Sequence, residues 1–198
     1  MIRTFVSLVL ALALGFALGC GGKVPPERAY YLLRGAPNEF SAVDGGLEIG
    51  LGNVRVAPYL DRAGLIVEVG ANEVREARFH LWAEPLQRGI HYYLEDRIAA
   101  ELGRQLAPAP AAKNGWLYRV DVRVREFHGD LEGEVRLVAS FSLIGVESGE
   151  VLVEEQVSFA ERRPIEGYPG LVQAQMSLLD RLAASIAAAL RGASVLPG

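Results

Sequence analysis

The sequence contains very little cysteine, lysine or histidine: one Cys, two Lys and three His among 198 residues. A single cysteine excludes an intrachain disulfide and any zinc site built from several cysteines. The 20 basic and 24 acidic side chains leave a formal net charge of −4, whereas a general nucleic-acid binder needs a cationic surplus. With 51% hydrophobic and 22% charged residues, the chain is neither a disordered nor a many-span membrane protein. The composition therefore predicts a compact globular protein that binds no nucleic acid.

The histidines stand far apart in the sequence, at His80, His91 and His128. His80 precedes Glu84 by four residues and His91 precedes Glu95 by the same interval, so each pair could offer two metal ligands. A catalytic zinc site usually needs a third protein ligand, and the chain contains no HExxH segment. We therefore expect no metal site, and we expect His91 and Glu95 to lie on a solvated helix face.

Other signatures of catalysis are missing as well. The chain has no G-x-S-x-G segment, and no thiol remains for nucleophilic work if Cys20 is acylated. Gly50-Leu51-Gly52 lacks the third glycine of a dinucleotide fingerprint, because Arg55 occupies its place. These absences predict a protein that is not an enzyme and that holds no cofactor.

Residues 1–19 are typical of a secretory signal peptide, with Arg3 as its positive start and an uncharged apolar run from Phe5 to Leu18. That run is shorter than the about 20 residues that a transmembrane helix needs. Its end, Phe16-Ala17-Leu18-Gly19-Cys20, resembles the bacterial lipobox, whose cysteine receives a diacylglycerol and becomes the mature N-terminus. Ala17 departs from the usual Leu at its position. The alternatives are an ordinary signal peptide with an incidental cysteine and an uncleaved anchor.

Acylation of Cys20 would hold the protein on a membrane through several fatty chains. Residues 20–28 would then be a lipidated tether, because their glycines and prolines favour a spacer. In lipoproteins of bacteria with two membranes, an Asp directly after the cysteine generally retains the protein in the inner membrane, and here that residue is Gly21. We therefore expect an outer-membrane lipid anchor that faces the periplasm.

Residues 29–198 are expected to form a single domain rich in strands. The cleanest alternation of apolar and polar residues runs from Tyr118 to Arg125. The patterns predict strands near residues 30–34, 47–56, 65–69, 73–81, 118–125, 135–143 and 151–159. The turn at 70–72 predicts a hairpin, and the short turns at 128–130 and 147–150 predict an antiparallel meander.

Apolar residues at four-residue spacing predict two helices. The first has Pro85 in its first turn and ends near Pro108, and the second covers Gly170 to Arg191. We expect them to pack side by side on the buried face of the sheet. The predicted order is ββββ-α-βββ-α, an α+β fold with an antiparallel or mixed sheet and two main helices on one face.

Two motifs, about twenty residues apart, carry a resemblance to a known family. They are Tyr59-Leu60-Asp61-Arg62, within the run 54–62, and Trp82-Ala83-Glu84-Pro85-Leu86, which follows His80 and Leu81. Together with Tyr31-Leu32-Leu33 and Ile66-Val67, they resemble the ABC-type transport auxiliary lipoprotein family over nearly all of the mature chain.

The resemblance implies a membrane-anchored lipoprotein that works with a periplasmic MCE-domain protein and, indirectly, with an ABC permease in moving lipids between two membranes. It implies a component that docks or caps the conduit and has no catalytic role. A homo-oligomeric ring would suit that role, because symmetric repetition multiplies weak contacts. The alternatives are an assembly factor of another outer-membrane complex and a periplasmic lipid-binding shuttle, which would need an apolar cavity on the order of several hundred Å³.

The motif residues are candidate partner contacts, and each also has a structural interpretation. Asp61 and Arg62 could fix a loop by charge-assisted hydrogen bonds, Trp82 could fill the core, and the helix dipole could stabilise Glu84. The sequence leaves both roles open for the whole set: Tyr59, Leu60, Asp61, Arg62, Trp82, Glu84 and Pro85.

Overall fold

The computed structural model describes residues 26–35, 48–108 and 115–193, which form a mixed sheet of seven strands and two helices. The elements are β1 (Ala29–Tyr31), β2 (Ile49–Val56), β3 (Gly64–Gly70), β4 (Glu73–Trp82), α2 (Leu86–Leu102), β5 (Tyr118–Gly129), β6 (Glu134–Gly145), β7 (Val151–Arg162) and α3 (Gly167–Gly192). The predicted α+β class and the order of elements are confirmed. The signal peptide and Cys20 lie outside the described residues.

The strands follow the order β1-β4-β3-β5-β6-β7, and β2 pairs with β5 beside this path. The predicted hairpin of β3 and β4 and the predicted antiparallel meander of β5, β6 and β7 are both present. Two pairings are parallel, β1 with β4 and β2 with β5. The first half of β5 pairs with β2, whereas Gly129 at its end pairs with Val67 of β3. Strands β2 and β3 thus pair with successive parts of β5.

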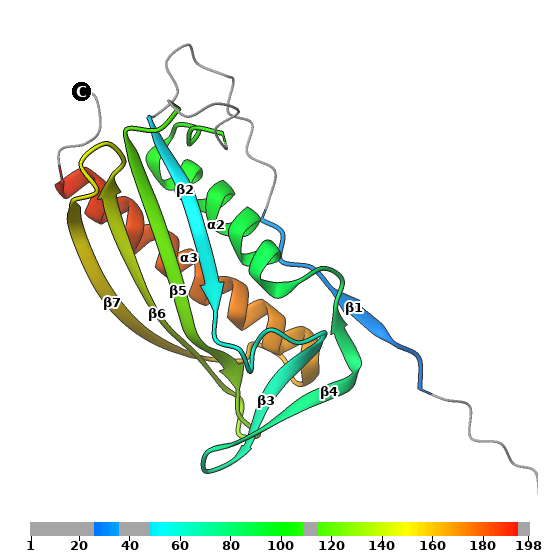
Figure 1. The fold of residues 1–198 in the computed structure, drawn as a ribbon. Helices are drawn as coiled ribbons and strands as arrows, with labels where there is room; N and C mark the ends of the chain where they lie inside the picture. The colour runs from blue at the N-terminus through cyan, green and yellow to red at the C-terminus, as the bar shows by residue number, and fades with distance from the viewer. Residues whose placement is uncertain (1–25, 36–47, 109–114, 194–198) are drawn as a thin grey trace, which may run out of the picture.

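Both helices cover the same face of the sheet, as Figure 1 shows, with α2 and α3 side by side behind the strands. The alternation on β5 explains this arrangement, because Val120, Val122 and Val124 are buried in the core with the apolar face of α3. Arg119, Asp121, Arg123 and Arg125 of the same strand belong to the opposite face, which we call the open face. The predicted packing of the two helices on one face is confirmed.

The first helix is shorter than the sequence predicts. It ends at Leu102, because Gly103 adopts a left-handed conformation with φ 65° and its N–H bonds the last carbonyls of the helix. Leu106, the last residue of the four-residue pattern, is still buried, but it packs from the segment after the helix. Pro85 precedes the first helical residue, Leu86, instead of lying within the first turn.

Two strand boundaries also differ from the prediction. A bulge in β5 between Val124 and Glu126 shifts the register, and the strand continues to Gly129. His128, predicted in a turn, is therefore part of the strand and buried. At the outer edge, β7 was predicted near residues 151–159 but continues to Arg162. Its first residue, Val151, is exposed, and β7 pairs only with β6 among the described strands.

A polar cluster joins the two helices on their partly exposed side. Asp180 of α3 accepts hydrogen bonds from Tyr93 Oη at 3.0 Å and from Arg97 Nε at 2.7 Å, and both donors belong to α2. Burial raises the pKa of Tyr93, and the neighbouring Asp180 carboxylate raises it further, so the phenol remains a hydrogen-bond donor. The cluster fixes how the helices lie against each other. Neither of these helices is long and apolar enough to cross a membrane.

Candidate functional site

The first sequence motif places its side chains in opposite environments. Leu60 is 1% exposed and belongs to the core, whereas Asp61 and Arg62 are exposed in the loop between β2 and β3. Main-chain hydrogen bonds hold this loop, from the Leu60 N–H to the carbonyl of Ala57 and from the Arg62 N–H to the carbonyl of Leu60. Leu60 therefore offers no side chain to a partner.

Asp61 and Arg62 do not fix the loop through their side chains in the part of the chain that the structure describes. The loop is tied to β5 instead by Tyr59, whose hydroxyl donates to the carbonyl of Arg125 at 3.1 Å. Burial raises the pKa of Tyr59 to about 12, which keeps this donor protonated. The structural role suggested for Asp61 and Arg62 is not observed, and both side chains are accessible to a partner.

The second motif is mainly structural in this fold. Trp82 is 8% exposed and fills the core at the end of β4, so it is not available as a contact. Glu84 accepts a hydrogen bond from Arg34 at 2.6 Å, which ties the segment after β1 to the start of α2. The first turn of α2 contains no acidic residue, so Glu84 lies outside the turn where a helix dipole would stabilise it. The interaction that the structure shows for Glu84 is this ion pair. Pro85 is exposed.

The histidines do not come together. Among the described residues, no three side chains of the His, Cys, Asp and Glu types lie where they could hold a metal. His80 stacks on Tyr168 with ring centroids 3.9 Å apart and shares a 2.9 Å hydrogen bond with the Tyr31 hydroxyl. His91 reaches the carbonyl of Leu51 on β2 at 3.2 Å.

His128 sits in a charged setting near the Tyr59 ring. Its side chain is buried, its Nδ1 has no hydrogen-bond partner, and Glu68 Oε2 lies 3.9 Å from that atom. Burial lowers the pKa of His128, while the Glu68 carboxylate opposes the shift. Arg136 forms an ion pair with Glu68, and its positive charge lowers the pKa of His128 further. These side chains line a cavity of about 540 Å³ that opens to the surface.

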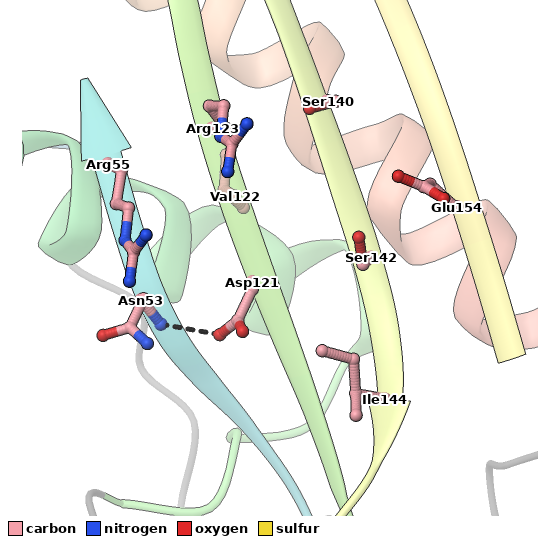
Figure 2. Close-up of a pocket in the computed structure, with 9 residues that line it drawn as sticks. All are labelled: Asn53, Arg55, Asp121, Val122, Arg123, Ser140, Ser142, Ile144 and Glu154. Carbon is pink, nitrogen blue, oxygen red and sulfur yellow. Dashed lines mark hydrogen bonds between the residues drawn. The ribbon is translucent and has the colours of Figure 1, made fainter. Parts of the chain in front are cut away.

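A second cavity, of about 250 Å³, lies on the open face of the sheet, and Figure 2 shows it. We call it the open-face pocket. The side chains that line it come from β2, β5, β6 and β7: Asn53, Arg55, Asp121, Val122, Arg123, Ser140, Ser142, Ile144 and Glu154. Polar side chains dominate the set, because polar residues of a sheet covered on one side alternate onto its other side.

The charged side chains of this pocket belong to two rows of register neighbours across the strands. Arg55 pairs in register with Arg123, which pairs with Ser140. Two residues along β5, Asp121 pairs with Ser142, which pairs with Glu154. The pocket therefore combines two arginines that are register neighbours with two carboxylates from the next row along the strands, a chemistry suited to binding a charged group.

The open-face pocket is the feature that sequence reasoning missed. The arginines of β5 were visible as the polar half of an alternating strand, which indicates exposure and nothing more. Arg55 joins them only because β2 pairs with β5 in parallel, a long-range pairing that no local pattern specifies. The signal that could have suggested the site is the coincidence of two strands whose polar positions both carry arginine.

The comparisons with known proteins agree with this fold. The family model of the ABC-type transport auxiliary lipoprotein component matches residues 30–187 of this chain. One solved structure of an uncharacterized protein is 18% identical, with a TM-score of 0.70 over 83% of this chain and 99% of that one. A DUF330 protein from Xanthomonas campestris is 15% identical, with a TM-score of 0.65 over 83% of this chain and 96% of that one. No curated protein matches.

The two solved structures establish a shared α+β fold. The family match then identifies the chain, because it covers the molecule from β1 into the last turns of α3. The protein belongs to the ABC-type transport auxiliary lipoprotein family.

Proposed function

We propose that this protein is a membrane-anchored, non-catalytic lipoprotein that docks or caps the periplasmic conduit of an intermembrane lipid transport system at the outer membrane. Its direct partner is a periplasmic MCE-domain protein, and through it the lipoprotein serves an ABC permease. The observation that carries the proposal is the extent of the family match. That match begins ten residues after Cys20 and leaves only the signal, the tether and the last residues outside.

The proposed organisation is compatible with the same match. Residues 1–19 are the signal peptide, residues 20–28 carry the acylated Cys20 and the tether, and residues 29–198 form the single domain. All described elements from β1 to α3 contribute to one sheet or to one hydrophobic core, which supports a single folding unit.

The docking role is supported by the nature of the surface. The two cavities described above open to the surface and are lined by many charged side chains, which suits a protein contact better than a lipid chain. A third cavity, of about 740 Å³ between β7 and α3, is lined largely by apolar residues such as Leu152 and Val153, and it is the feature that favours the shuttle alternative. Asp61 and Arg62 add exposed charges on the loop between β2 and β3. Such surfaces suit contacts with another protein at a polar rim. A ring of several copies would repeat these contacts around a conduit.

The experiment uses photocrosslinking in the native envelope. A crosslinkable amino acid at position 62 should capture an MCE-domain protein, and the same group at Arg88, an exposed residue of α2, is the matched control. The capture should be lost or strongly reduced when Cys20→Ala releases the protein from the membrane fraction. Abundant lipid on the isolated protein and no MCE-domain protein at position 62 would instead favour the shuttle.

A further inference from the structure

We propose that Arg55 and Arg123 form a site for a carboxylate, contributed by an aspartate or glutamate side chain of the docked partner. This inference rests on the docking role proposed above and adds the chemistry by which the partner is recognised. It concerns the open-face pocket, in which Arg55 belongs to the run 54–62 around the first family motif, whereas Arg123 lies apart from both motifs in the sequence.

The backbone register places the two arginines side by side. Arg55 and Arg123 are direct neighbours across the parallel pair of β2 and β5, and strands in a sheet lie about 4.8 Å apart. Both side chains are exposed and line the same pocket. Each guanidinium carries five N–H donors in a planar fork that matches the two oxygens of a carboxylate. The Ser140 hydroxyl, opposite Arg123 on β6, adds a donor at the same level.

The nearby acids do not neutralise this pair. Asp121 is already engaged, because it accepts from the Asn53 N–H at 2.8 Å and pairs with Arg119 at 3.0 Å. Within the described residues, neither Arg55 nor Arg123 makes a hydrogen bond or an ion pair through its side chain. Like charges that stand directly opposite each other in a sheet are destabilising. A bound anion would reduce that repulsion.

The surroundings favour a carboxylate on a protein over the phosphate of a lipid. Next to the arginines the pocket is lined by Ser142 and Glu154, and the following residue of β7 on the same face is Gln156. Apart from Val122 and Ile144 the lining is polar or charged, so the pocket suits an acidic side chain of a protein better than an acyl chain. A volume of about 250 Å³ is enough for one such side chain. Glu154 at the far wall repels a second negative charge, so it restricts the anion to the arginine side of the pocket.

The test is a titration of the full-length protein in detergent, with arginine labelled by ¹⁵N. The probe is a blocked Gly-Glu-Gly peptide, and the controls are blocked Gly-Gln-Gly and inorganic phosphate. We expect the Nε–Hε signals of Arg55 and Arg123, assigned with Arg→Lys variants, to move with the glutamate peptide and not with the glutamine peptide. Arg55→Gln or Arg123→Gln should each weaken binding about three- to fivefold, the range of a single exposed ion pair. Arg75→Gln, an exposed position on β4, should not change it.

Three results would overturn the inference. The first is a shift of equal size at all arginines, and the second is no shift at all. The third is tighter binding of inorganic phosphate than of the glutamate peptide, which would assign the site to a phosphate group. In the envelope, the double variant Arg55→Glu and Arg123→Glu should reduce the capture of the MCE-domain protein from position 62, while Arg75→Glu should not. If position 62 captures no such protein in the parent chain, the docking role fails even where the peptide binds.

Discussion

The Tyr59-Leu60-Asp61-Arg62 motif should separate cleanly into residues that hold the fold and residues that do not. Leu60 is 1% exposed, so replacing it by alanine removes buried carbon worth about 2.5 kcal/mol in transfer free energy. The cavity left behind raises the loss of unfolding free energy to about 3–4 kcal/mol. Asp61→Asn and Arg62→Gln change exposed groups and should stay within about 0.5 kcal/mol of the parent.

Urea unfolding followed by circular dichroism measures these differences, and a thermal scan provides a second readout. For a protein of this size, the expected loss in Leu60→Ala corresponds to a melting temperature lower by roughly 6–16 °C. The separation of roles would be refuted if Leu60→Ala lost less than about 1 kcal/mol. It would also be refuted if Asp61→Asn or Arg62→Gln destabilised the protein as much as Leu60→Ala does.

Three further predictions concern the packing and the charges of the fold. A methyl group added at Gly50 would lie 2.0 Å from Trp116 Cε2, so Gly50→Ala should displace that ring and change the tryptophan fluorescence. The free energy of unfolding, measured by urea titration, should fall by about 1–3 kcal/mol. An unchanged emission spectrum would contradict this. A double-mutant cycle on Arg97 and Asp180 should give a coupling of about 0.5–1 kcal/mol, because both groups are partly exposed; a coupling of zero would mean that the pair does not join the helices. Burial lowers the pKa of His128 below its ordinary 6.5, so the unfolded chain takes up the proton first. The contribution of neutral His128 to stability is therefore complete above pH 6.5 and falls as the pH drops towards the folded-state pKa. The free energy of unfolding should be measured for the parent and for His128→Gln between about pH 7.5 and pH 5. We expect the variant to lose less stability than the parent as the pH falls.

Most of the fold was predictable because its elements carry strong local signals. The alternation from Tyr118 to Val124 and the turn at Asn72, whose φ is +62°, mark strands and a hairpin without any reference to the rest of the chain. The errors have local causes of a different kind. Gly103 stops a helix whose apolar spacing continues to Leu106, and the bulge before Glu126 extends a strand past an apparent turn.

The candidate site was much less predictable than the fold. Burial of Leu60 and Trp82 follows from their apolar character, but the motif alone does not tell which of its charged residues are engaged. Glu84 meets Arg34 across a long stretch of sequence, and Arg55 meets Arg123 only through the parallel pairing of β2 with β5. Contacts of this kind depend on tertiary register, which single-sequence patterns do not encode.

That parallel pairing also bears on how the chain folds. The meander of β5, β6 and β7 is built from neighbouring segments joined by short turns, so its contacts close with little loss of chain entropy. Strand β2 must wait for β5 to be made, because Ile49 finds Tyr118 only after β3, β4 and α2 have been synthesised between them. Such non-local contacts slow folding. The pairing of β2 with β5 therefore belongs to the slower contacts of this fold, and the meander belongs to the faster ones.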